Sequence, residues 1–217
     1  MSSYWQALPG EAVDRVIVTV SFMRLDAKPE RRWSALPAGT RLELAPRLSV
    51  TAYRDLYDRV GGPWLWWLRR MMPEPMLARL LADPAVAVYR LWHGETVAGF
   101  FELDATSWPD VNLSYFGLLP EAIGQGLGFA LLGAAIDQVF SGPVRGMTVN
   151  TCTADHPRAL PNYQRAGFRI IRQVREVWDI PQRLGFAIPP HLRPISQASG
   201  GPADRAADRA DDASGAA

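Results

Sequence analysis

The chain has 217 residues, of which 48% are hydrophobic, so it is long enough to bury the core of one domain. Its 23 basic and 22 acidic residues nearly cancel, which removes the electrostatic case for nucleic acid or an anionic membrane as a main partner. The single cysteine, Cys152, excludes an intramolecular disulfide and a multi-cysteine zinc site, and the three scattered histidines lack metal-ligand spacing. We expect a cytoplasmic protein with no bound metal, because the sequence shows no export signal and no apolar run that spans a bilayer.

Two periodicities alternate along the chain: every second residue is apolar in the expected strands, and every third or fourth in the expected helices. Ser49 and Thr51 are possible caps of the first helix, which Gly61 ends, and Gly94 marks a hairpin turn. The patterns predict, in chain order, strands over 13–23 and 41–44, helices over 53–60, 64–71 and 77–81, strands over 86–92, 96–103 and 111–119, a helix over 129–140, a strand over 145–151, a helix over 157–166 and a strand over 168–178.

The turn between the strand at 111–119 and the helix after it is rich in glycine, with Gly124, Gly126 and Gly128. Glycines let the backbone approach a ligand closely, and amides at a helix start attract an anion such as a pyrophosphate. A dinucleotide fingerprint does not match, because the sixth position counted from Gly124 is Phe129, and a P-loop does not match, because the turn lacks lysine. Glycines in such a turn also serve packing alone, so the motif needs support from elsewhere.

A second motif follows this turn. It consists of His156, Ala159, Tyr163, Gly167 and Phe168, at the spacing Asn, x, x, Ala, three residues, Tyr, three residues, Gly-Phe, with His at the first position. The two motifs together resemble the GNAT superfamily of acetyl-CoA-dependent N-acetyltransferases, over roughly residues 85–178. The resemblance implies an α/β fold, with a mixed and mainly antiparallel twisted sheet and helices on both faces. It also implies direct acetyl transfer from acetyl-CoA to an amine.

On this basis the chain divides into three parts. Residues 1–40 supply an N-terminal strand and a Pro-rich connector to the same domain, 41–185 form the acetyltransferase domain, and 186–217 form a tail. After Ile195 the tail has no aromatic and no large aliphatic residue, so we expect it to be disordered.

The resemblance places the acetyl-CoA contacts on the glycine turn and on the second motif. The cofactor-binding candidates are Leu118, Leu119, Ile123, Gly124, Gln125, Gly126, Leu127, Gly128 and His156. Ile123 and His156 replace polar family residues, so backbone amides are expected to make most of the contacts. An amide near Leu118, at a bulge that Gly117 favours, is expected to bind the thioester oxygen as it becomes an oxyanion.

Proton transfer requires an acid and a base. Tyr163 aligns with the general acid of the family, which protonates the departing thiolate. Histone-type members carry a glutamate where this chain has Asn112, so Glu102 on the neighbouring strand is the candidate base. Desolvation beside phenylalanines would raise its pKa, whereas pairing with an arginine would give it a structural role. Glu121 and Asp155 are reserve candidates.

The acceptor site of the resembled family lies at its first two helices, where this chain has an aromatic group. Trp66 and Tyr53 are the substrate-binding candidates, through cation-π contact with an amine. Tyr53 belongs to the buried helical stripe, so core packing competes with that role, whereas Trp66 lies off the stripe. Arg69 and Arg70 are candidates to meet an acceptor carboxylate. The acceptor itself stays open: a small amine, amino acid, aminoglycoside, peptide N-terminus or protein lysine.

Two other functions are compatible with the sequence. A catalytically inactive module that binds CoA or a partner is the main alternative, because Asn112 and His156 replace functional residues of the family. A thiol-dependent acyltransferase would use Cys152 with Asp155 and His156. Neighbours in sequence rarely form such a triad, and a cysteine at the end of a strand is most often an inert core residue.

Overall fold

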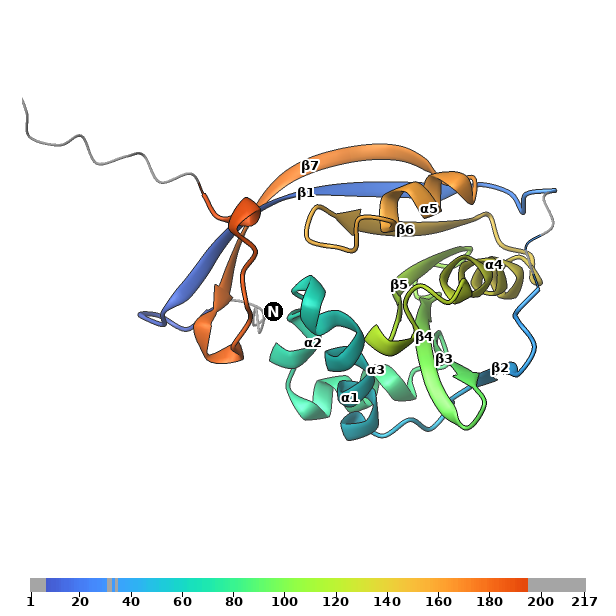
Figure 1. Ribbon diagram of the computed structural model, residues 1–217, viewed down its shortest axis with the longest axis horizontal. Coiled ribbons are helices and arrows are strands. Elements are labelled where there is room, and N and C mark those ends of the chain that lie inside the picture. The colour runs from blue at the N-terminus through green and yellow to red at the C-terminus, as the bar shows by residue number, and fades with distance from the viewer. Residues whose placement is uncertain (1–6, 31–32, 34, 195–217) are drawn as a thin grey trace, which may run out of the picture.

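The computed structural model describes residues 7–30, 33 and 35–194. Its strands are β1 (Val13–Leu25), β2 (Thr40–Leu44), β3 (Val86–His93), β4 (Thr96–Asp104), β5 (Asp110–Leu118), β6 (Gly146–Cys152) and β7 (Arg169–Pro181). They form one seven-stranded sheet in the order β2-β3-β4-β5-β6-β1-β7 (Figure 1). Neighbours are antiparallel except β5 and β6, which are parallel. The predicted mixed and mainly antiparallel sheet is confirmed.

Helices cover both faces of this sheet, as predicted. They are α1 (Val50–Gly61), α2 (Leu68–Met71), α3 (Glu74–Ala82), α4 (Leu127–Val139) and α5 (Ala159–Arg165), with short 3-10 turns at Gly62–Trp64, Pro120–Ala122, Gln182–Leu184 and Pro190–Leu192. Phe100 and Phe101 are adjacent on β4, so their side chains point to opposite faces. Phe100 packs with α1 and α3, and Phe101 packs with α4. No helix in the described part of the chain is long and apolar enough to cross a membrane.

Of the two possible caps, Ser49 is the one that caps α1. Ser49 accepts a hydrogen bond from the Ala52 amide, which satisfies one of the unpaired donors of the first turn. The stripe that contains Tyr53 and Tyr57 is buried, as its helical spacing predicts.

The helix predicted over 64–71 is wrong for its first half. Leu65 adopts a left-handed φ of 59°, and only Leu68–Met71 is helical. Leu65 and Trp67 are buried against β1, whereas Trp66 packs with α1 and β5. The three residues thus contact two different parts of the fold, which one helical stripe does not allow.

The segment 186–194 belongs to the folded domain, which corrects the predicted start of the tail at residue 186. Ile188 and Leu192 are buried in one cluster with Val16, Val18 and Ile180 of β1 and β7. Composition alone missed this because the segment's two buried aliphatic residues are separated by prolines. The rest of the predicted tail, 195–217, lies outside the described residues.

We expect Leu192→Ala to lower the free energy of unfolding by about 2–5 kcal/mol, because the side chain is only 2% exposed. Urea denaturation measures the change. The neighbouring His191→Ala is the control, since His191 is exposed and its truncation should cost less than about 0.5 kcal/mol. Equal unfolding midpoints for the two variants would contradict the packing of this segment.

Candidate active site

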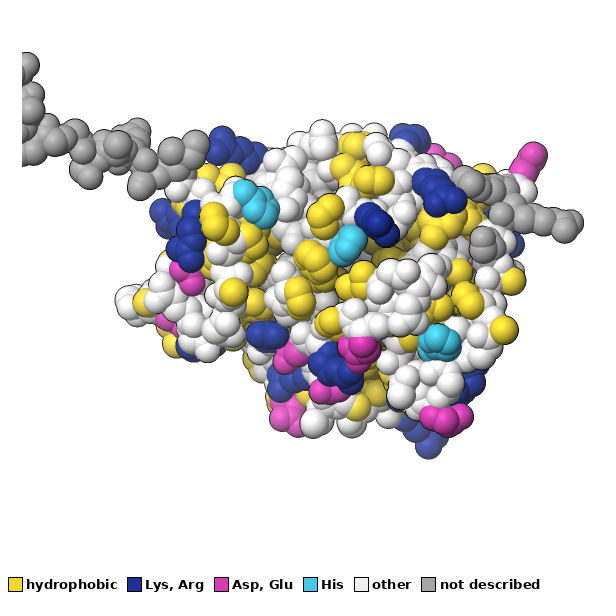
Figure 2. Space-filling model, viewed as in Figure 1, with side chains coloured by type: hydrophobic (Ala, Val, Ile, Leu, Met, Phe, Trp, Pro, Cys, Tyr) yellow, Lys and Arg dark blue, Asp and Glu magenta, His cyan; other side chains and the backbone are white. Residues whose placement is uncertain are grey.

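The site is a pocket where two parallel strands separate. β5 and β6 pair from Asp110 with Gly146 to Leu113 with Val149, and no further pair joins them in the described chain. A cavity of about 1000 Å³ opens at this point, lined by both strands, α1, α2, α5 and the start of α4. Figure 2 shows hydrophobic side chains gathered between β6 and α2, over this opening.

The separation leaves backbone donors of β5 facing the pocket. The Leu119 amide donates to the Ala98 carbonyl, and β4 and β5 stay in register back to Tyr115. Because antiparallel pairing alternates, the amides of Phe116 and Leu118 point away from β4, toward the pocket. The predicted bulge at Gly117 is wrong: Gly117 pairs in register with Phe100, and the irregularity falls at Ser114.

The glycine turn supplies a second set of donors. Gly124 and Gly126 have φ values of 88° and 77°, a conformation that glycine adopts without strain. Gly126 is the N-cap residue of α4, which begins at Leu127, two residues earlier than predicted. The unpaired amides of this first turn therefore open onto the pocket lining at Gly126 and Gly128.

Six of the nine cofactor-binding candidates line the pocket: Leu118, Ile123, Gly124, Gly126, Gly128 and His156. The other three have different positions. Leu119 and Leu127 are buried in the core, because the turn directs their side chains under α1 and α4. The Gln125 side chain donates to the Glu121 carbonyl and braces the turn from outside.

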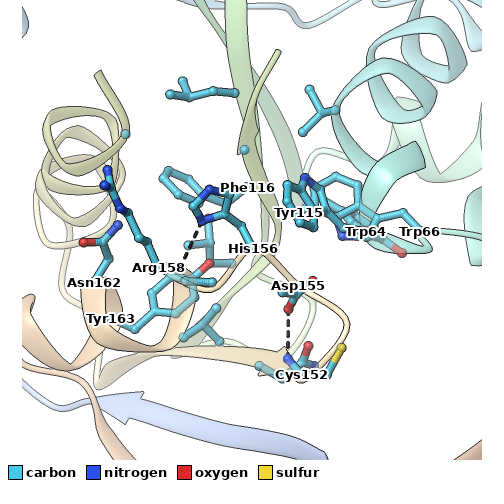
Figure 3. Close-up of a pocket in the computed structure, with 18 of the residues that line it drawn as sticks. Trp64, Trp66, Tyr115, Phe116, Cys152, Asp155, His156, Arg158, Asn162 and Tyr163 are labelled. Carbon is cyan, nitrogen blue, oxygen red and sulfur yellow. Dashed lines mark hydrogen bonds between the residues drawn. The ribbon is translucent and has the colours of Figure 1, made fainter. Parts of the chain in front are cut away.

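Tyr163 lines the same end of the pocket as the glycine turn. Its ring packs between Phe116 and Phe168, with centroid distances of 6.2 and 5.8 Å. Burial, reinforced by the negative charge of Asp155, raises the pKa of its phenol. The hydroxyl therefore keeps its proton at neutral pH, as a proton donor must. Figure 3 shows Tyr163 beside Asn162 and Arg158.

His156 connects the two sides of the pocket. Its Nδ1 accepts a hydrogen bond from the Arg158 amide at 3.0 Å. Its ring lies edge-on to Trp64 at a centroid distance of 5.1 Å. Trp64 follows α1 and His156 precedes α5, so this contact joins the helices of the two faces.

Asp155 lies between these two sides (Figure 3). Its Oδ2 accepts from the Thr151 hydroxyl at 2.7 Å and from the Cys152 amide at 2.8 Å. Burial raises the pKa of the carboxyl, and hydrogen bonds from Thr151, Cys152 and Trp66 offset only part of that rise. A partly buried carboxylate that lines a pocket and has a raised pKa is typical of a proton acceptor.

Glu102 does not line the pocket, and it is fully buried between Arg69 and Tyr53. It forms a 2.7 Å ion pair with Arg69 and accepts a hydrogen bond from the Tyr53 hydroxyl. Tyr53, a predicted acceptor residue, is likewise buried outside the pocket lining. Tyr53 is buried because it belongs to the face of α1 that packs on the sheet, where its hydroxyl contacts Glu102 of β4. Trp66, the other acceptor candidate, lines the pocket.

Glu121 and Cys152 are not placed for proton transfer or nucleophilic attack. Glu121 is exposed and paired with Arg59. Burial and the nearby Asp155 raise the pKa of the Cys152 thiol to about 12, so the thiol stays protonated at neutral pH. Within the described chain, no group of His, Cys, Asp and Glu is arranged to hold a metal ion.

The sequence profile of the acetyltransferase (GNAT) family matches residues 50–168, from α1 to the end of the second motif. The chain belongs to this family. A GCN5-related N-acetyltransferase from Sphaerobacter thermophilus superposes with a TM-score of 0.54 at 20% identity, over 80% of this chain and 54% of that chain. A GCN5-related N-acetyltransferase from Kribbella flavida superposes with a TM-score of 0.53 at 14% identity, over 80% of this chain and 63% of that chain.

These likenesses show that the fold is a GNAT fold. The chain covers less than two thirds of the length of each of these two proteins. No curated protein matches the chain in sequence.

The buried pair of Arg69 and Glu102 gives a test of Glu102. We expect Glu102→Gln to lower the free energy of unfolding by about 3–5 kcal/mol, because Arg69 would be left buried without its counter-ion. The matched control is Asp58→Asn, which removes the partner of Arg70 at a more exposed position and should cost less than about 1 kcal/mol. Denaturant unfolding of both variants decides: similar losses would mean that the Arg69 pair is not structural.

Proposed function

We propose that this GNAT protein is an acetyl-CoA-dependent N-acetyltransferase that transfers the acetyl group directly to a primary amine in a ternary complex. One observation supports this most strongly. The inward amides of β5, the first turn of α4 and the Tyr163 side chain all open onto one pocket. The β5 amides can donate hydrogen bonds to an acyl oxygen, and the amides of α4 can donate them to a diphosphate. Tyr163 can donate a proton to a leaving thiolate.

The end of the pocket near α4 has the charge that a CoA diphosphate requires. Arg158 and Arg165 line it beside the positive end of the α4 dipole. Arg165 also lies over the Phe129 ring at 4.2 Å, which holds its guanidinium at the start of α4. Ile123, where the family has a polar residue, leaves diphosphate binding to these arginines and to backbone amides.

The acyl oxygen would be held by the amides of Phe116 and Leu118. Such donors stabilise negative charge as it develops on the oxygen, and in a dry pocket each is worth more than in water. Tyr163 would then donate its proton to the departing thiolate. The raised pKa of the phenol keeps it protonated until the carbon–sulfur bond breaks.

We assign proton acceptance from the amine to Asp155 in place of Glu102. Asp155 lines the pocket, whereas both Glu102 oxygens are engaged by Arg69 and Tyr53 away from it. To accept a proton, Glu102 would have to lose a buried ion pair, at a cost of several kcal/mol.

An inactive CoA-binding module remains the second candidate because of Asn112. Its side chain accepts from Thr148 and donates to Ser114, so it acts as a structural link between β5 and β6. An amide cannot accept a proton at neutral pH. A screen of amine acceptors by free-thiol release from acetyl-CoA separates the two functions: binding without release for any amine supports the module.

We expect Gly126→Val to weaken acetyl-CoA binding at least about tenfold, because valine is strained at a φ of 77° and would displace the α4 amides. Isothermal titration calorimetry measures this. Gly94→Val is the control, since Gly94 also has a positive φ but lies in the β3–β4 hairpin, outside the pocket lining. If both variants bind acetyl-CoA like the wild type, the α4 turn is not the diphosphate site.

We expect Tyr163→Phe to lower kcat about 100-fold with little change in acetyl-CoA affinity. The substitution removes only the hydroxyl and keeps the ring contacts with Phe116 and Phe168. Steady-state thiol release measures kcat, and calorimetry measures affinity. The control is Tyr89→Phe, because Tyr89 stacks on Phe101 away from the pocket lining. Wild-type turnover in Tyr163→Phe would make Tyr163 a packing residue.

A further inference from the structure

We infer that the acceptor is a monoamine with an apolar body about the size of an aromatic ring and with no carboxylate group. This inference rests on the proposed acetyl transfer and concerns the end of the pocket opposite α4. We call this end the acceptor end; its walls are Tyr57, Trp64, Trp66, Trp67, Tyr115 and Trp178.

The acceptor end is built to keep aromatic surface exposed to a ligand. Trp66 lies against Tyr57 and Tyr115, with centroid distances of 5.4 and 5.0 Å. A side chain at position 61 would clash with it, because a Cβ on Gly61 would lie 2.2 Å from the indole. Gly61, at the end of α1, therefore leaves the space that the Trp66 indole occupies. Trp66 remains partly exposed, although a core position would bury it fully.

The charges at the two ends differ in sign. Arg158 and Arg165 line the α4 end, whereas Asp155 and Glu176 line the acceptor side. Asp155 and Glu176 are close enough that both raise the pKa of the Cys152 thiol between them. Glu176 itself accepts a hydrogen bond from the Trp178 indole at 2.8 Å, which fixes it to the wall.

One cation also lines the acceptor end, but its charge is already neutralised. The Arg69 guanidinium pairs with the buried Glu102 at 2.7 Å and lies over the Tyr115 ring at 5.1 Å. An acceptor carboxylate would meet Asp155 and Glu176 without a free counter-charge, and would be repelled. This excludes α-amino acids as good acceptors and favours amines without an acid group.

The apolar walls also disfavour polycations. One ammonium group has a partner in Asp155, which lies between the Tyr163 side and the Trp66 side (Figure 3). The other carboxylate of the lining, Glu176, already accepts a hydrogen bond from the Trp178 indole, so a second ammonium group would have to compete with it. Further ammonium groups would have to leave water against Val60, Leu65 and Leu68, which offer no anion. An apolar body pays no such cost, and it gains by covering Trp66.

The transfer step balances as follows. The ammonium of the acceptor loses one proton to Asp155, and the neutral nitrogen then forms a bond to the thioester carbon. The carbon–sulfur bond breaks, and Tyr163 gives its proton to the sulfur. The nitrogen's second proton returns to the Tyr163 oxygen as the amide forms. Asp155 releases its proton to water, so the products are the N-acetylated amine, CoA and one proton.

A matched panel of acceptors tests the inference on the wild-type protein. Tryptamine and 2-phenylethylamine carry the apolar body, tryptophan and phenylalanine add only a carboxylate, ethylamine lacks the body, and spermidine adds charges. The readout is kcat/KM from thiol release. We expect tryptamine and 2-phenylethylamine to exceed ethylamine by about 10- to 100-fold, the gain from covering one aromatic ring. We expect them to exceed the amino acids by more than about 100-fold, the cost of an unpaired charge.

Trp66→Leu assigns the preference to the acceptor end. It should bring the ratio of tryptamine to ethylamine kcat/KM to within about threefold of one, because Trp66 is the aromatic side chain that the body of the acceptor covers. Trp92→Leu is the control and should keep the wild-type ratio, since Trp92 lies on β3 outside the pocket lining. Calorimetry with acetyl-CoA checks that each variant is folded.

The outcomes separate the two proposals. Thiol release with the amino acids or spermidine preferred would overturn the inference and leave the acetyltransferase function in place. Thiol release with equal rates for tryptamine and ethylamine would overturn it as well. Acetyl-CoA binding without thiol release for any member of the panel would overturn the inference, and the wider amine screen described above then decides whether the protein is an acetyltransferase. A wild-type preference that survives in Trp66→Leu would overturn the assignment to this wall.

Discussion

The separation of β5 from β6 is the constraint on which the site depends. The two strands share only four paired positions, and each then follows its other neighbour, β5 along β4 and β6 along β1. Inward-facing amides of β5 lose their sheet partner as a result, and buried unpaired amides cost free energy unless something binds them. A ligand that accepts hydrogen bonds from these amides would remove this cost. The backbone amides of Phe116 and Leu118 therefore form a binding surface to which no side chain contributes.

The walls of this opening are held by contacts between elements distant in the sequence. Arg69 on α2 reaches Glu102 on β4 in a buried ion pair, and Arg70 beside it pairs with Asp58 on α1. These two pairs fix α2 although it has only one helical turn. The first pair also removes a positive charge from the pocket, so Asp155 sets the electrostatic potential near Trp66. Arg69 and Glu102 thus both hold α2 in place and determine the charge of this part of the pocket.

Local signals were sufficient for the strands, the Ser49 cap, the glycine turn and the place of Tyr163. Each depends on neighbours in sequence: alternation, a capping hydroxyl, positive φ at Gly126, or spacing within one helix and its flanks. The predictions failed where a contact with a residue distant in the sequence determines the position of a side chain. Glu102, the candidate base, is held in the core by Arg69 of α2, and Leu65 leaves helical geometry to reach β1. No periodicity of the sequence records either partner.

The two ends of the pocket also differ in which part of the chain supplies them. The α4 end lies within residues 50–168, the segment that matches the family. The acceptor end takes Val20 and Phe22 from β1 and Glu176 and Trp178 from β7, which lie outside that segment. Behind them, Ile188 and Leu192 pack on β1 and hold these walls in place. The proposed acceptor end therefore combines Trp66 and Asp155 of the family segment with Glu176 and Trp178 of a flanking strand that no motif describes. The preference that we infer for an apolar amine therefore depends on the assembled sheet and not on one motif.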